Sequence, residues 1–169
     1  MFEFKKVNFD ISFINDDFYR YLKYNDFFVA PASTKYHGNY QGGLLKHSIN
    51  VATILNNLTI NNKLKWMDNR SPTLIGLFHD LCKIDNYIKT DNGYIHNKDI
   101  TLNGHGDKSI MILSQFIKLT VEEIHCIRWH MGAFDNKDNW NSYSSSIKKY
   151  PNVLWTHHAD MISATIDNI

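Results

Sequence analysis

The chain has 169 residues, of which 43% are hydrophobic and 14% aromatic, and its formal net charge at neutral pH is +1. This composition predicts a packed globular chain with its own core and argues against intrinsic disorder. The balanced charge gives no sign of a basic nucleic-acid stripe, and two cysteines are too few for a disulfide framework. With no apolar leader and no run of ~18 apolar residues, we expect a cytoplasmic protein without a membrane partner.

The elements predicted along the chain are mostly helices, because apolar residues recur at helical spacing. We expect helices over 11–25, from Gly42-Gly43 onward, over 71–83, 104–117 and 120–131, and from Pro151 onward. Ser71-Pro72 is a helix start signal, and Thr120 with Glu123 has the spacing of a capping box. Segment 26–41 looks irregular, and we expect 135–146 to be a polar surface loop.

A β-hairpin is predicted between these helices, over residues 87–95. Asn92-Gly93 separates two β-prone segments, which is a strong hairpin signal. The chain has no internal repeat and no linker rich in Pro, Gly or Ser, so residues 1–169 are expected to form one domain. The predicted fold class is all-α, with this hairpin as the one small sheet.

The pair His79-Asp80 is the strongest chemical signal, because it ends an apolar helical run. Burying an unpartnered histidine and aspartate would destabilise the fold by roughly several kcal/mol. A bound metal ion would remove this cost, because imidazole and carboxylate are both good metal ligands. His47 and Asp160 lie on other predicted helices beside apolar neighbours, and ligands from separate helices of a bundle can converge on one ion. We therefore predict a metal site of His47, His79, Asp80 and Asp160. The alternative for His79-Asp80 is a buried hydrogen-bonded pair.

Five sequence blocks carry a resemblance to a known family: 37–48, 78–83, 104–106, 127–132 and 157–160. From about residue 36 to 163 the chain resembles the HD superfamily of metal-dependent phosphohydrolases, and most closely its small bacterial and phage members. The resemblance implies the HD helical bundle. In members that hold two ions the aspartate of the His-Asp pair bridges them, which implies that Asp80 bridges and that His105 and His130 bind the second ion. The alternatives are a helix cap for His105 and a supporting role for His130.

Imidazole ligands favour Mn, Fe, Co, Ni or Zn over Mg, so we expect one or two divalent transition-metal ions, with Mg as a further option. Such ions neutralise phosphate charge and lower the pKa of bound water toward ~7. Lys83 lies one turn after Asp80, and both are expected to be catalytic, with Lys83 also binding the substrate phosphate. Arg128 is a second candidate phosphate ligand. His37, on a glycine-flanked loop, is a candidate to donate a proton to the leaving group or to hold a phosphate.

The leading functional hypothesis is a phosphohydrolase that cleaves an ester or anhydride of a nucleotide or a related small molecule. A single-strand 3′-5′ exonuclease is an alternative, because some HD proteins share the block Gly42 to His47. Long nucleic acid is the less expected partner, since the chain has no basic excess. Cyclic-dinucleotide phosphodiesterases of the HD-GYP type carry a second histidine and a glycine where this chain has Met131 and Cys82. Other cyclic-nucleotide phosphodiesterases, a non-catalytic metal-bound nucleotide sensor and a homodimer stay open.

Overall fold

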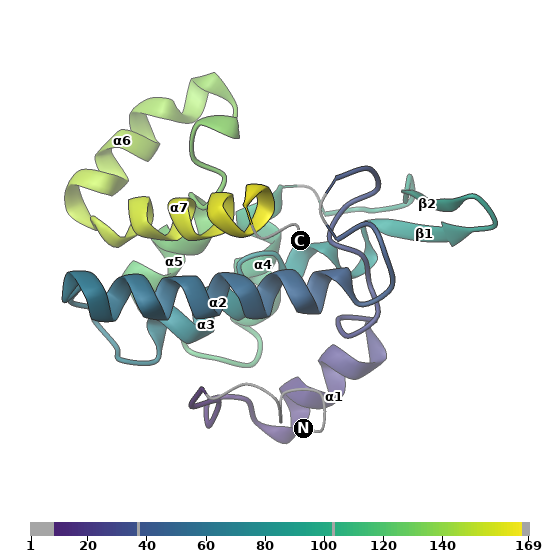
Figure 1. The fold of residues 1–169 in the computed structure, drawn as a ribbon, viewed down its shortest axis with the longest axis horizontal. Helices are drawn as coiled ribbons and strands as arrows, with labels where there is room; N and C mark the ends of the chain where they lie inside the picture. Colours follow the sequence, from purple (N-terminus) through teal and green to yellow (C-terminus); the bar gives the residue numbers. More distant parts are fainter. Residues whose placement is uncertain (1–8, 37, 103, 167–169) are drawn as a thin grey trace.

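The computed structural model describes residues 9–36, 38–102 and 104–166. It consists of helices and one β-hairpin (Figure 1), so the predicted all-α class with a small hairpin is confirmed. The α-helices are α1 (Asp16–Tyr24), α2 (Gly43–Asn62), α3 (Ser71–Phe78), α4 (His105–Leu113), α5 (Val121–Arg128), α6 (Trp140–Lys149) and α7 (Asn152–Thr165). The 3-10 helices are η1 (Leu81–Asp85), η2 (Gly132–Phe134) and η3 (Lys137–Asn139), and the strands are β1 (Tyr87–Thr90) and β2 (Gly93–His96). Among the described helices, none combines the length and the apolar character that crossing a membrane requires.

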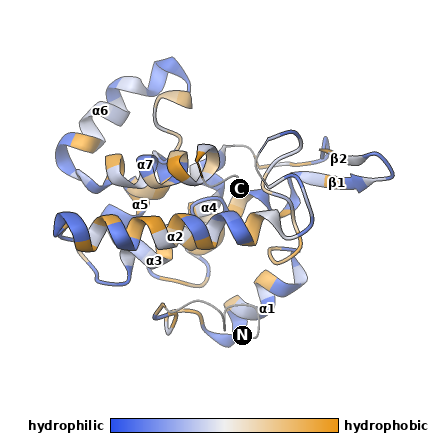
Figure 2. Cartoon of the chain, viewed as in Figure 1, coloured by the Kyte–Doolittle hydropathy of each residue, from blue (hydrophilic) through white to orange (hydrophobic). Residues whose placement is uncertain are grey.

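Helix α2 is central to the packing, because it lies against both α3 and α7 (Figure 1). Polar and apolar residues alternate along it (Figure 2), and its apolar residues Leu44, Val51 and Leu55 are fully buried. Helix α1 closes one end of the core through Phe18, whose ring stacks on Phe116 at 5.1 Å between centroids. The buried apolar residues from α1 to α7 form one connected cluster, which holds α2, α3, α5 and α7 at fixed positions.

Several helix boundaries follow from capping groups that the sequence shows. Helix α1 begins later than residue 11 because the Asn15 side chain accepts a hydrogen bond from the Phe18 amide and caps it. The predicted capping box of Thr120 and Glu123 is present at the start of α5. In the hairpin, Thr90 pairs with Gly93 and Tyr87 with His96, as the Asn92-Gly93 signal predicts.

The helix predicted over 71–83 is wrong at its C-terminal end, because α3 ends at Phe78 and the chain continues as η1. The Cys82 amide would donate to the Phe78 carbonyl in a continued α-helix. It donates instead to Ser109 Oγ of α4, at 3.0 Å. Asp80 therefore lies in the turn between α3 and η1.

The surface loop predicted over 135–146 is also wrong, since residues 140–149 form α6. The many serines make this segment look like a polar loop. Tyr143 and Ile147 are nevertheless four residues apart, on one face of the helix, and both pack on the core. The Tyr143 ring lies 6.2 Å from that of Trp129, which attaches α6 to the end of α5.

The distance between α2 and α3 depends on Gly76, which faces Ala52 across the interface. A Cβ atom at Gly76 would lie 2.6 Å from the Ala52 nitrogen and 2.8 Å from its Cβ atom. The two backbones can approach this closely only because Gly76 has no side chain. His47 and His79 lie within five residues of this contact on their helices, so the contact also sets the distance between their rings.

We predict that Gly76→Ala destabilises the protein by about 1–3 kcal/mol, because the new methyl group must push α2 and α3 apart. Helix propensity alone would make the alanine variant more stable, because alanine favours the helix over glycine. A loss of stability would therefore have to come from the packing. Chemical denaturation measures the free energy of unfolding, and Ser144→Ala at an exposed position of α6 is the matched control. Equal stability of Gly76→Ala and the wild-type protein would contradict the proposed close packing.

Candidate metal centre

The six predicted ligand residues come from separate parts of the chain and converge between the helices. His47 lies on α2, His79 and Asp80 follow α3, and Asp160 lies on α7. His130 follows α5, and His105 is the first residue of α4. The side chains of His47, His79, Asp80 and His130 are almost fully buried, whereas that of His105 is 43% exposed. The Asp160 side chain is 14% exposed, so the cluster is most accessible at His105.

Asp80 is at the centre of this cluster, and its two carboxylate oxygens face different histidines. Oδ2 lies 3.6 Å from Nε2 of His47 and 3.5 Å from Nε2 of His79. Oδ1 lies 3.5 Å from Nε2 of His130 and 3.8 Å from Nδ1 of His105. The two oxygens of Asp80 thus face two different pairs of histidines.

Asp160 supplies the second carboxylate of the cluster. Its Oδ1 lies 3.1 Å from Nε2 of His47 and 3.6 Å from Nε2 of His79. Two ligand groups of compact geometry result, one of His47, His79 and Asp80 and one of His79, His130 and Asp160. In each group, one candidate ligand atom per residue lies within 4.8 Å of the others.

Hydrogen bonds on the outer nitrogens orient the imidazoles of the cluster. Nδ1 of His79 contacts the Gly76 carbonyl at 3.0 Å, and Nδ1 of His130 contacts the Ile127 carbonyl at 2.7 Å. A carbonyl can only accept, so each Nδ1 donates and carries a proton. In the neutral ring, Nε2 then has its lone pair directed into the cluster. Nδ1 of His47 lies 3.1 Å from Ser163 Oγ, a hydroxyl that can donate or accept, so this contact orients the ring without fixing which nitrogen carries the proton.

The inner polar atoms of this cluster fit a divalent cation. Nε2 of His79, Nε2 of His130 and Oδ1 of Asp80 are buried and form no hydrogen bond with the described residues. Orphaned buried polar atoms cost about 1–3 kcal/mol each, and here they are all directed at one another. Imidazole nitrogens and carboxylate oxygens at such spacing are the donor set that a first-row transition metal prefers. Coordination would satisfy these atoms together.

The charges in the cluster act strongly on each other. Burial alone would lower the pKa of His79, but Asp80 and Asp160 outweigh it and raise the pKa to about 10. Burial alone would raise the pKa of Asp80, but the Lys83 ammonium and His79 hold it well below its usual range. Burial lowers the pKa of His47, which favours its neutral form. The cluster thus attracts positive charge, which a proton or a metal ion can supply.

The three predicted substrate-contacting residues have different surroundings. Lys83 is buried, and its Nζ lies 2.6 Å from Asp80 Oδ2. In the described structure its contact is therefore with Asp80. Arg128 forms ion pairs with Asp107 at 2.8 Å and Asp135 at 2.7 Å, and its guanidinium lies over the Trp129 ring. These contacts tie α5 to α4 and to the following loop. His37 lies outside the described residues.

Two residues near the cluster were not predicted to take part in it. Cys82 is buried, and its Sγ lies 3.7 Å from Nδ1 of His105. It forms a third candidate ligand group with Asp80 and His105. Ser163 orients His47 from α7. The sequence could have pointed to Cys82, because it follows Asp80 by two residues. Nothing in the sequence pairs Ser163 with His47.

One curated protein is similar to this chain at the level of sequence. It is a dihydroneopterin 2′,3′-cyclic phosphate phosphodiesterase from Methanocaldococcus jannaschii. The two are 28% identical over 145 residues, which cover 83% of this chain and 53% of the relative. The chain therefore spans about half the length of that relative. No family model matches the chain, and no solved structure matches it.

We predict that cation binding to this cluster releases protons and weakens as the pH falls from 8 to 6. The raised pKa of His79, about 10, means that its metal-free form is protonated throughout this range, and the cation must displace that proton. Calorimetric titration with Mn²⁺ or Co²⁺ in two buffers of different ionisation enthalpy measures the protons released. Binding without proton release at pH 7 would contradict this assignment of the cluster.

Proposed function

We propose that this chain is a metal-dependent phosphodiesterase of HD type, and that it hydrolyses a small cyclic phosphate ester to a phosphate monoester. The observation that carries the proposal is the buried cluster around Asp80, in which three oriented imidazoles and two carboxylates converge. The similarity to a cyclic phosphate phosphodiesterase supports the same reaction class. The single connected core supports one HD-type domain.

His47, His79, Asp80 and Asp160 would hold one divalent cation, and His105 and His130, with Asp80, are placed for a second. When bound, such cations supply charge neutralisation at the phosphate and make water a better nucleophile. In the overall reaction, water adds to phosphorus and one P–O bond of the ring opens. The released oxygen takes a proton, and the product is a monoester with a free hydroxyl group.

The protein's own side chains contribute orientation and access. Lys83 fixes Asp80 through the 2.6 Å contact to Oδ2, so the carboxylate cannot rotate when the substrate charge approaches. The carbonyl contacts of His79 and His130 hold both rings in place before substrate arrives. Because His105 is the most exposed residue of the cluster among the described ligands, the phosphate group would enter on its side.

We predict that Asp80→Asn loses both cation binding and activity, because the amide has one oxygen and no charge to share between the two histidine groups. The wild-type protein loaded with Mn²⁺, Co²⁺, Ni²⁺ or Fe²⁺ should convert nucleoside 2′,3′-cyclic phosphates to monoesters, and a chelator should stop the reaction. We expect Asp80→Asn to reduce turnover by about a hundredfold or more. Phosphorus NMR follows the product, and elemental analysis gives the metal content.

The matched control is Asp99→Asn, which makes the same chemical change at an exposed position. It should retain metal content and turnover. Asp80→Asn protein with normal metal content and rate would remove the central residue from the proposal. A wild-type protein that hydrolyses neither these nucleotides, whether cyclic, mono-, di- or triphosphate, nor dihydroneopterin 2′,3′-cyclic phosphate with any of these metals would refute the proposed function itself.

A further inference from the structure

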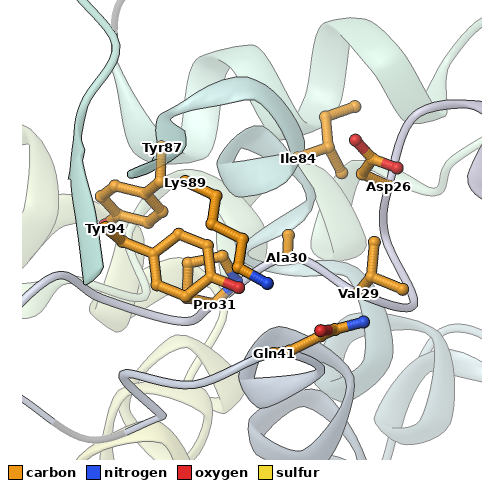
Figure 3. Close-up of a pocket in the computed structure, with 9 residues that line it drawn as sticks. All are labelled: Asp26, Val29, Ala30, Pro31, Gln41, Ile84, Tyr87, Lys89 and Tyr94. Atoms are coloured by element: carbon orange, nitrogen blue, oxygen red, sulfur yellow. The ribbon is translucent and has the colours of Figure 1, made fainter. Parts of the chain in front are cut away.

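A pocket of about 210 Å³ lies beside the metal cluster, between the hairpin and the segment that precedes α2 (Figure 3). In the figure, Tyr87, Tyr94 and Lys89 form one side, and Asp26 and Val29 lie at the other end. Ala30, Pro31, Gln41 and Ile84 complete the lining. The proposed function does not use any of these residues.

The hairpin builds one wall of the pocket with a single face. Tyr87 and Lys89 are two residues apart on β1, and Tyr94 is the cross-strand partner of Lys89. Side chains at these positions share one face of an antiparallel pair. The Tyr87 ring is steadied by His96, its own cross-strand partner, at 5.3 Å between centroids.

The opposite wall is held against the start of α2 by backbone hydrogen bonds. The Gly42 amide donates to the Val29 carbonyl, and the Leu44 amide donates to the Ala30 carbonyl. Asp26 adopts the left-handed conformation, with φ of 60°, and its carbonyl accepts from the amides of Val29 and Ala30. The pocket therefore has two walls that are fixed independently of any ligand.

The pocket also borders the metal cluster. Ile84 and Lys83 are neighbours on η1, where Ile84 lines the pocket and Lys83 contacts Asp80. Burial raises the pKa of the Tyr87 phenol, the Lys83 ammonium lowers it, and the Asp80 carboxylate raises it, so Tyr87 lies close to both charges. Asp26 and Lys89 are the charged residues of the pocket lining itself, and the candidate metal centre adjoins the pocket through Lys83.

We propose that this pocket binds the heterocycle of the substrate, and that the heterocycle presents an amino group beside a ring N–H. Guanine and pterins share this edge. The ring would stack on Tyr87 or Tyr94. An ionised carboxylate only accepts hydrogen bonds, so Asp26 selects a ring edge with two adjacent donors. The Gln41 amide can donate to the oxo group that neighbours the ring N–H in both heterocycles.

The size of the pocket supports this division of the substrate. At about 210 Å³ it is smaller than the roughly 300–1,000 Å³ typical of pockets that enclose a whole drug-sized ligand. It suits one flat ring system, with the phosphate-bearing tail left outside and directed past Tyr87 to the cluster. This inference rests on the proposed function for the identity of that tail.

The test compares kcat/KM for two substrates of the same protein sample. A smaller fraction of folded or metal-loaded protein lowers both values equally, so their ratio does not change. We expect the wild-type protein to prefer guanosine 2′,3′-cyclic phosphate over adenosine 2′,3′-cyclic phosphate by about tenfold or more, the effect of one charge-assisted hydrogen bond. Dihydroneopterin 2′,3′-cyclic phosphate, as a third substrate, separates a pterin from a purine. Asp26→Asn, which tolerates the left-handed backbone, should reduce the preference over adenosine by about tenfold.

Two controls make the result specific. Asp91→Asn at the exposed hairpin turn should keep the wild-type ratio, and Tyr24→Ala, at a tyrosine that is 83% exposed, is matched to Tyr94→Ala. Tyr94→Ala should raise KM for all three cyclic phosphates, whereas Tyr24→Ala should not. Metal-dependent hydrolysis with a guanosine-to-adenosine ratio near one, or with a ratio unchanged in Asp26→Asn, would overturn the pocket assignment and leave the proposed function standing.

If the protein hydrolyses no cyclic phosphate, binding of the heterocycle alone still tests the pocket assignment. Neopterin and guanosine lack the phosphate, so calorimetric titration reports on the pocket without turnover. If no cyclic phosphate is hydrolysed but either compound binds and Asp26→Asn abolishes that binding, the pocket assignment stands and the proposed reaction fails. If neither compound binds to the wild-type protein at millimolar concentration, the pocket assignment is wrong.

Discussion

The burial of the Asp80 carboxylate is the constraint on which the rest of this site depends. An isolated carboxylate in a protein interior is strongly unfavourable, so its surroundings must supply positive charge or hydrogen-bond donors. Here the ammonium of Lys83 provides part of that charge. The imidazoles of His47, His79 and His130 lie around the rest of the carboxylate. These partners come from α2, from the end of α3 and from the end of α5, so the helices must meet at this point for the chain to fold.

Much of this arrangement could be predicted because the relevant signals are local. The His79-Asp80 pair at the end of an apolar run, the capping box at Thr120 and the Asn92-Gly93 turn each report on a few neighbouring residues. The convergence of His47 with Asp160 needed one further step, the assumption that amphipathic helices direct such side chains inward.

The features that escaped prediction depend on contacts between distant segments. The end of α3 is set by Ser109 of α4, which takes the Cys82 amide out of the helix, and no neighbour of Cys82 in sequence shows this. The apolar row of α6 is diluted by serines and becomes visible only against Trp129. The pocket beside Tyr87 joins a hairpin to a segment some sixty residues earlier, so its composition could not be read from either part alone.

The ion pair between Lys83 and Asp80 has a consequence for the charge of the whole cluster. With neutral histidines, the charges of Asp80, Asp160 and Lys83 add up to a single negative charge. One bound divalent cation would turn this into a single positive charge, which the one negative charge of a phosphodiester would neutralise. A phosphate monoester gains further negative charge near neutral pH. In the proposed reaction the buried lysine would thereby match the charge of the cluster to a diester, and this match would be lost once the ring has opened.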